Sequence, residues 1–357
     1  MVKVKPFRLG VVEGFFGKSW SWESRTQYAQ FLSGNGFTTY LYAPKNDDYF
    51  RKQWKKPCPI SHIDALTRLA THYKGAGIEF AIGLSPFELY MDFSSTGQDA
   101  LSRKLEEINA INPDTLCILF DDMPGAVNNL ADEQLKIMDF VTRHSKARDY
   151  IFCPTYYSDD PLLEAHFGKR PKRYLEELGG QLDSRIDVFW TGPNVFTSEF
   201  TKDHLHEITG KLSRKPLLWD NYPVNDSKIL AGNLHFAPFM NRSPELKNLT
   251  QGHMANPMNQ ASLSQISLYS LGKLYQEDGF NSETILEEAF NTLCPPKIST
   301  LLLEDSILFQ DKGLENFSAE EFKSLMTRYS PFQEHPMVAE LLDWLNGNYA
   351  FDPQCLT

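Results

Sequence analysis

The chain has 357 residues, of which 41% are hydrophobic and 13% aromatic, so it can bury a large core and is not a disordered polypeptide. Its net charge is −11 and its basic residues are scattered. We therefore expect no nucleic-acid partner, because phosphate binding needs a concentrated basic face. No stretch approaches the roughly 18 apolar residues of a membrane span, and the start lacks the apolar segment of a signal peptide. We expect no membrane association.

Eight short apolar runs, separated by amphipathic stretches, are typical of buried β-strands. Successive runs start about 30 to 40 residues apart, the size of one βα unit. This pattern predicts an α/β protein with a (β/α)8 TIM barrel as its catalytic domain. The expected strands are Arg8–Glu13, Thr38–Ala43, Glu79–Leu84, Thr115–Phe120, Tyr150–Pro154, Asp187–Trp190, Pro216–Trp219 and Gly252–Ala255.

Helical patterns lie between these strands, and the pattern becomes helical without strands near the carboxyl end. We expect residues 1–278 to form the barrel and residues 279–357 a small α-helical extension. Examples of the expected helices in the barrel are Trp22–Leu32, His62–His72, Ala100–Asn109, Glu133–His144 and Pro171–Leu178, with Gln260–Tyr275 as the last; those of the extension are Leu286–Leu293, Ile298–Leu308, Ala319–Tyr329 and Met337–Leu345.

The cysteines and histidines indicate neither a metal site nor a disulfide framework. The five cysteines are widely spaced and no pair has metal-ligand spacing, while the nine histidines form no HxxxH or HExxH pattern. We expect no metal, no cofactor and a reduced, cytoplasmic location.

The fourth strand candidate ends abruptly on two adjacent carboxylates, Asp121 and Asp122. A buried strand does not end in two charges unless they face water, a partner or a ligand. The carboxyl ends of barrel strands are where substrates bind. For an isolated Asp-Asp pair, a turn followed by a helix cap is an equally good interpretation, so the other strand ends decide the matter.

Those other strand ends carry glycine, lysine, tyrosine, tryptophan and asparagine, without a phosphate loop or a GxSxG serine. Amides and carboxylates bind hydroxyl groups, and aromatic rings lie along the C–H face of a sugar. The composition of this end of the barrel therefore favours a neutral, hydroxyl-rich ligand and a carbohydrate-active enzyme.

Adjacent residues on a strand point to opposite faces, so Asp121 and Asp122 are poorly placed as a nucleophile and acid across one bond. They suit a substrate that carries its own nucleophile, such as a 2-acetamido sugar that forms an oxazoline. One carboxylate then orients the amide N–H while the other protonates the leaving oxygen. We expect the acid to have a pKa raised by its carboxylate neighbour.

Seven motifs, in order, resemble the family 84 glycoside hydrolases, which are the O-GlcNAcases and hyaluronidase-like β-N-acetylglucosaminidases. The resemblance covers about residues 7 to 275. The motifs are GVVEGFFG (Gly10–Gly17), YLYAPK (Tyr40–Lys45), LFDD (Leu119–Asp122), FCPTYY (Phe152–Tyr157), WTGP (Trp190–Pro193), LWDN (Leu218–Asn221) and NPM (Asn256–Met258).

The resemblance implies a retaining exo-β-N-acetylglucosaminidase with substrate-assisted catalysis on terminal β-linked N-acetylglucosamine. It implies that Asp121 orients the acetamido group and that Asp122 is the general acid, then base. Tyr157 would hold the acetamido oxygen, and Trp219 would form a wall of the acetyl pocket with Thr191 and Val195 nearby. The residues implied to bind sugar hydroxyls are Gly14, Lys45, Asn221, Asp226 and Asn256.

The chain departs from the family pattern in three places. Asn46 stands where the family often has Asp, Tyr156 where Glu is common, and Met123–Gly125 follows the acid pair. No departure removes a catalytic group, but the last one could reshape the loop beside the leaving group.

Two alternatives remain beside this interpretation. A chitinase-like or hexosaminidase-like enzyme would use a glutamate in a DxxDxDxE or Asp-Glu setting, which the sequence lacks. A catalytically silent GlcNAc- or glycopeptide-binding barrel would keep the pocket without turnover. The partner is expected to be a GlcNAc-bearing protein or glycan. The natural aglycone and the oligomeric state stay open, a dimer included, because family members pair through helical segments.

Overall fold

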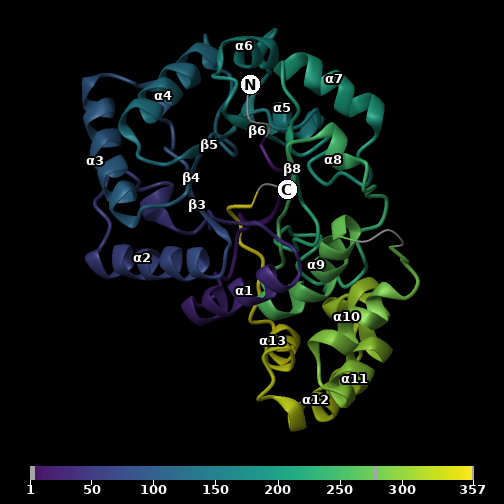
Figure 1. The fold of residues 1–357 in the computed structure, drawn as a ribbon. Helices are drawn as coiled ribbons and strands as arrows, with labels where there is room; N and C mark the ends of the chain where they lie inside the picture. The colour runs from purple at the N-terminus through teal and green to yellow at the C-terminus, as the bar shows by residue number, and fades with distance from the viewer. Residues whose placement is uncertain (1–4, 277–279, 356–357) are drawn as a thin grey trace. The chain divides into compact units, whose positions relative to one another are not determined.

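The computed structural model describes residues 5–276 and 280–355. Within these residues, strands β1 to β8 form a closed barrel in chain order (Figure 1), which confirms the (β/α)8 prediction. Every expected strand is present, and its ends differ from the expected ones by at most one residue. The strands are β1 (Arg8–Glu13), β2 (Thr39–Tyr42), β3 (Glu79–Leu84), β4 (Thr115–Leu119), β5 (Asp149–Cys153), β6 (Asp187–Trp190), β7 (Leu217–Asp220) and β8 (Gly252–Ala255).

The strands are almost entirely buried because parallel strands are covered on both faces. Their register places the carboxyl ends of neighbours at one level. Leu119 at the end of β4 pairs with Cys153 at the end of β5, and Trp190 at the end of β6 pairs with Leu218 on β7. The residues that follow these strands therefore lie together at the carboxyl end of the barrel, as the sequence predicts.

The helices that follow the strands include three that were not among the helical patterns named from the sequence, α5, α7 and α8. In Figure 1, α2, α3, α4, α6 and α7 lie outside the strands. The helices up to β8 are α1 (Trp22–Gly34), α2 (Ile60–Gly75), α3 (Ser95–Ile111), α4 (Leu130–His144), α5 (Pro161–Phe167), α6 (Tyr174–Gln181), α7 (Lys202–Leu212) and α8 (Leu246–Leu249). Those after it are α9 (Ala261–Gln276), α10 (Ile285–Leu293), α11 (Pro296–Ile307), α12 (Ala319–Tyr329) and α13 (Pro336–Leu345).

Side chains fix several helix starts by accepting hydrogen bonds from backbone N–H groups that have no partner inside the helix. Ser21 does so for α1, Asp160 for α5 and Thr201 for α7. Helix α12 begins with a capping box in which Ser318 and Glu321 bond each other's backbone N–H. None of the helices in the described ranges combines the length and apolar character that crossing a membrane requires.

The chain divides into two compact units that interleave along the sequence. The first consists of the segment ending at Glu13, Phe37–Asn221 and Glu245–Met254. The second consists of Gly14–Gly36, Tyr222–Pro244 and the chain from Ala255 onward. The predicted boundary between residues 278 and 279 lies outside the described residues. From residue 280 to residue 355 the elements are helical, as expected for the extension.

The second unit has its own hydrophobic core, to which segments far apart in the sequence contribute. Phe236 from the stretch after β7, Leu263 from α9, Phe290 from α10 and Trp344 from α13 all belong to it. Phe236 and Phe290 meet edge to face, with ring centroids 5.7 Å apart. The segments after β7 and β8 are therefore packed into one core with the helical extension.

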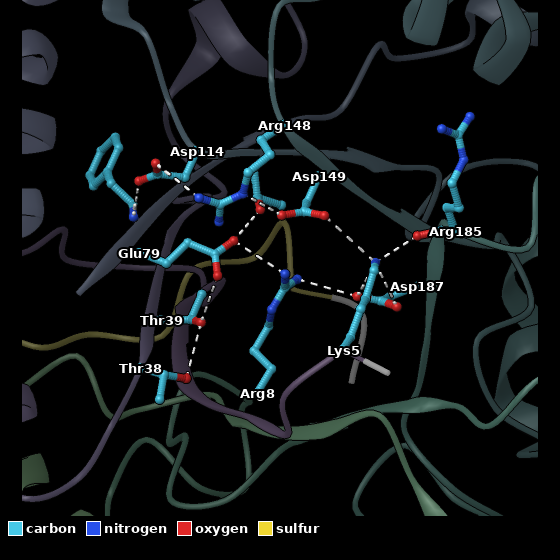
Figure 2. Close-up of polar contacts among 12 residues, drawn as sticks. Lys5, Arg8, Thr38, Thr39, Glu79, Asp114, Arg148, Asp149, Arg185 and Asp187 are labelled. Carbon is cyan, nitrogen blue, oxygen red and sulfur yellow. Dashed lines mark hydrogen bonds and ion pairs between the residues drawn. The ribbon is translucent and has the colours of Figure 1, made fainter. Parts of the chain in front are cut away.

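An ion-pair network closes the amino-terminal end of the barrel in the first unit (Figure 2). Arg8 at the start of β1 donates from Nη2 to Glu79 Oε1 (3.2 Å), and its Nη1 lies 3.5 Å from Asp187 Oδ2. Lys5 pairs with the same aspartate (3.2 Å). These residues line a cavity of about 400 Å³ in which each lining carboxylate has a basic partner. Charges at this end are thus compensated within the protein, which suits a stabilising role.

Candidate active site

The two adjacent carboxylates lie just beyond the carboxyl end of β4. The strand ends at Leu119, and the N–H of Phe120 donates to the carbonyl of Cys153 on β5 (2.9 Å). Asp121 is only 5% exposed, and Asp122 has φ = 57°. This left-handed conformation is uncommon outside glycine, although aspartate tolerates it, and the surrounding structure must hold it. The pair therefore occupies a fixed turn and not a straight strand.

Lys45, which follows β2, contacts both carboxylates at once. Its Nζ donates to Asp121 Oδ2 in a short hydrogen bond and lies 3.0 Å from Asp122 Oδ2. The argument that the carboxylates point to opposite faces is therefore wrong here, because the turn brings both to one ammonium group. Burial acts to lower the pKa of Lys45, but attraction to Asp121 and Asp122 outweighs it and the pKa is raised. The lysine stays charged.

The expectation of a raised pKa at the acid does not match the direction of the shift at Asp122. Burial raises the pKa of Asp121 against the opposing effect of Lys45. Burial also acts to raise the pKa of Asp122, but Lys45, Arg51 and a hydrogen bond from Tyr157 together lower it. Asp122, the expected acid, is thus the carboxyl held ionised.

One further charged side chain of the site, Arg51, was not predicted from the sequence. It follows the short 3-10 helix Asp48–Phe50 and is 5% exposed, and its positive charge favours the ionised form of Asp122. The loop that carries Lys45 and Arg51 is fixed by Asp47, which accepts from Tyr42 Oη (2.7 Å) and lies 2.9 Å from His62 Nε2. The sequence signal was present only as a basic residue within six positions of Lys45.

Tyr157, after β5, lies against the second carboxylate. Its hydroxyl donates to Asp122 Oδ1 over 3.4 Å. Its own backbone carbonyl accepts from Thr191 N (2.9 Å) and Thr191 Oγ1 (3.3 Å). Burial raises the pKa of Tyr157 well above the usual value, so the hydroxyl remains a donor. Thr191 is placed to hold the Tyr157 backbone.

Trp219, Asn221 and Val195 form one connected wall. The indole Nε1 of Trp219 donates to Asn221 Oδ1 (2.8 Å), and Asn221 Nδ2 donates to the carbonyl of Val195 (2.9 Å). The Trp219 ring meets Phe189 edge to face at 5.1 Å, and Lys45 Nζ lies 5.9 Å from the ring centroid. The indole is thus held rigidly beside the lysine and the carboxylates.

The other predicted sugar-binding residues, Gly14, Asp226 and Asn256, belong to the second unit and are brought together there. Asn256 Oδ1 accepts from Gly14 N (3.3 Å), and Asp226 Oδ2 accepts from the N–H of Phe16 (2.9 Å). Both Asp226 and Asn256 are buried. The loops after β1, β7 and β8 therefore form one hydrogen-bonded group.

Two of the departures from the family pattern form a single structural feature. Tyr156 is 1% exposed and its hydroxyl donates to the carbonyl of Gly168 (2.6 Å). A side chain at Gly125 would collide with the Tyr156 ring and hydroxyl. Glycine in the segment after the acid pair therefore makes room for a tyrosine that packs in the interior.

Asp121 has one oxygen available for a ligand. In the part of the chain that the structure describes, its Oδ1 is buried and accepts no hydrogen bond, while Oδ2 is held by Lys45. A buried acceptor without a donor is costly and calls for an explanation. Among the same residues no group of three histidine, cysteine or acidic side chains is arranged to hold a metal ion. The site offers an acceptor for an N–H donor, a second carboxylate, a tyrosine and an indole wall.

Comparison with known proteins places this arrangement among sugar hydrolases. Mouse and rat Protein O-GlcNAcase are each 27% identical over 351 residues, 95% of this chain. The chain spans about a third of their length, 36% of each. A solved mutant of the O-GlcNAc hydrolase from Thermobaculum terrenum is 29% identical with a TM-score of 0.76, covering 96% of this chain and 81% of that one.

The protein CpGH84B shares the fold, with a TM-score of 0.75, 23% identity and coverage of 96% of this chain and 66% of that one. The model of the β-N-acetylglucosaminidase family matches residues 9–304, which include every predicted site residue. The chain therefore belongs to the β-N-acetylglucosaminidase family, family 84 of the glycoside hydrolases.

Proposed function

We propose that this protein is a retaining exo-β-N-acetylglucosaminidase that uses the substrate's own acetamido group as its nucleophile. The observation that carries the proposal is the buried Oδ1 of Asp121, which accepts no hydrogen bond from the described residues. An acetamido N–H would supply the missing donor, and the contact would orient the amide oxygen toward the anomeric carbon. A sugar without this N–H would leave the acceptor unpaired.

In the first step the amide oxygen attacks the anomeric carbon as the glycosidic C–O bond breaks. Asp122 gives its proton to the leaving oxygen, and Asp121 stabilises the positive charge that develops on the oxazoline nitrogen. In the second step Asp122 takes a proton from water, which opens the oxazoline from the opposite face. Two inversions at one carbon give net retention.

For Asp122 to act as the acid, substrate binding would have to raise its pKa, which Lys45, Arg51 and Tyr157 lower in the structure. Lys45 is implied to bind a sugar hydroxyl, and its Nζ lies 3.0 Å from Asp122 Oδ2. When the ammonium group turns to the sugar, Asp122 loses its nearest positive partner. Its pKa then rises as the site closes to water, which prepares it as the acid.

The remaining contacts are proposed on the family resemblance. Tyr157 would hold the acetamido oxygen, and Trp219 would cover the acetyl group with Thr191 and Val195 nearby. Asn221, Gly14, Asp226 and Asn256 would bind the hydroxyl groups. These contacts would suit O-GlcNAc on protein serine or threonine and terminal β-GlcNAc of a glycan equally. The expected location is cytoplasmic.

The test measures release of 4-methylumbelliferone from its β-N-acetylglucosaminide by the wild type, Asp121→Asn and Asp122→Asn. We expect each variant to lose about 10² to 10⁴ in kcat. The loss at Asp122 should be smaller for good leaving groups, which need less protonation. A thiazoline that mimics the oxazoline should inhibit competitively.

Asp139→Asn is the matched control, because this aspartate is 67% exposed in a surface pair with Arg143 and should leave activity unchanged. A folded wild type that binds the thiazoline without turnover would replace the proposal with a GlcNAc-binding barrel.

A further inference from the structure

Helix α13 of the carboxyl-terminal extension contacts the segment that begins α9. The Oε1 of Glu340 accepts from Ser262 N (3.0 Å) and its Oε2 accepts from Leu263 N (2.9 Å). These are first-turn N–H groups of α9, which normally need a cap from their own segment. Helix α9 has no acidic residue in its own first turn. Glu340, more than 70 residues later, supplies the acceptor oxygens for two of these N–H groups.

The start of α9 in turn fixes the loop that follows β8. The N–H of Met258 donates to Ser264 Oγ of α9 (2.9 Å), two residues beyond Asn256. Asn259, in the same loop, donates from Nδ2 to the carbonyl of Phe16 (2.7 Å) in the loop after β1. A shift in the first turn of α9 is thus passed by hydrogen bonds to the segments that carry Asn256 and Gly14.

Helix α13 also contacts the loops after β1 and β7 directly. Asp343 Oδ2 lies 3.0 Å from Lys18 Nζ, which also sits 4.4 Å from the centre of the Tyr349 ring. Trp344 Nε1 donates to the carbonyl of Ala231 (3.4 Å). One helix therefore contacts all three segments of the second unit that carry predicted sugar-binding residues.

We propose that α13 positions the sugar-binding loops of the second unit, with Glu340 as the positioning residue. The inference rests on the proposed function for its kinetic readout. Glu340 does not touch the predicted site residues and acts through α9. Because Asp121, Asp122 and Tyr157 belong to the other unit, loosening this contact should weaken sugar binding more than the chemical step.

The experiment compares Glu340→Gln with the wild type. Glutamine keeps the shape but has one acceptor oxygen, and its NH₂ faces one of the two backbone donors. We expect KM to rise about tenfold, which corresponds to the loss of about one hydrogen bond to the sugar. The value of kcat should stay within about threefold of the wild-type value. Amide exchange should become faster at Ser262, Leu263 and residues 256–260. Glu334→Gln, at an exposed position near the start of the same helix, should change neither KM nor the amide exchange rates.

An unchanged KM, or a fall in kcat at constant KM, would overturn the inference. An inactive wild type would refute the proposed function, and amide exchange would then decide the matter alone. Unchanged exchange at residues 256–260 in Glu340→Gln would refute the positioning role, while faster exchange there would support it. Glu340→Asp, which keeps the charge but shortens the reach, should recover part of the affinity.

Discussion

Replacing Lys45 by methionine tests the electrostatics of the carboxylate pair, because it removes the one ammonium group that both carboxylates share. At 3.0 Å and an effective dielectric constant of about 20, the contact with Asp122 is worth about 5 kcal/mol before desolvation is subtracted. The lysine itself costs several kcal/mol to bury. We therefore expect Lys45→Met to lower the free energy of unfolding by about 3 to 5 kcal/mol at pH 8, the usual loss when one partner of a buried pair is removed.

The loss should depend on pH in a defined direction. In the wild type the pKa of Asp122 is lowered in the folded state, so this group adds stability above its unfolded pKa of about 4 and loses it in acid. In the variant the ammonium group is gone and Arg51 is the cation that remains, so burial raises the folded pKa of both carboxyls relative to the wild type. The folded variant is therefore most stable when both carboxyls are protonated, and it loses stability as the pH rises. The difference between the two proteins should therefore grow from pH 5 to pH 8.

Urea denaturation of both proteins at pH 5 and pH 8 measures this difference. We expect the loss at pH 5 to be smaller than at pH 8 by at least about 1.4 kcal/mol, which corresponds to one pH unit of titration by one carboxyl. Lys136→Met removes an exposed surface partner of Glu133 and should leave the free energy of unfolding unchanged within error at either pH. A Lys45→Met loss that is equal at both pH values would refute the reasoning.

Four further substitutions have defined outcomes. Gly83→Ala on β3 should cost about 1 to 3 kcal/mol of unfolding free energy, because the added carbon would lie 2.7 and 2.8 Å from two side chains. Gly75→Ala, with no atom within 4 Å of the added carbon, should gain up to about 1 kcal/mol in the same urea titration. Arg8→Met should lower stability by about 3 to 5 kcal/mol, with kcat/KM at 20 °C unchanged, and a change in kcat/KM would contradict its structural role. Tyr157→Phe should lower kcat by at least about tenfold, measured with the fluorogenic substrate.

The barrel was predictable because its strands are buried on both faces and appear as continuous apolar runs. The helix α7 was missed because its core face is only Leu205, Ile208 and Leu212 among polar residues. Its N-cap, Thr201, was the available signal. The helix α5 was also missed, although Asp160 followed by proline is a typical helix start.

The position of the two carboxylates, just beyond the buried strand β4, was predictable from the sequence, but the shifts of their pKa values were not. Those values depend on Lys45, 76 residues away from Asp121, and on Arg51, whose burial no local pattern shows. The same limit applied to the prediction that Asp121 and Asp122 point to opposite faces, since the positive φ of Asp122 depends on the surrounding structure. Local pattern identified the groups, and long-range contacts set their chemistry.

The interleaving of the two units also bears on how the chain folds. Gly14–Gly36 is synthesised more than 200 residues before the chain from Ala255 onward, yet both belong to one unit. The contacts of this segment have high contact order, so they form late and slowly. During synthesis α1 must wait, with its apolar residues Tyr28 and Leu32 uncovered, until α9 emerges. The loop after the first strand can thus reach its final conformation only after the carboxyl-terminal helices have been synthesised. Until then α1 is exposed, and we expect chaperone binding or aggregation to begin at this helix.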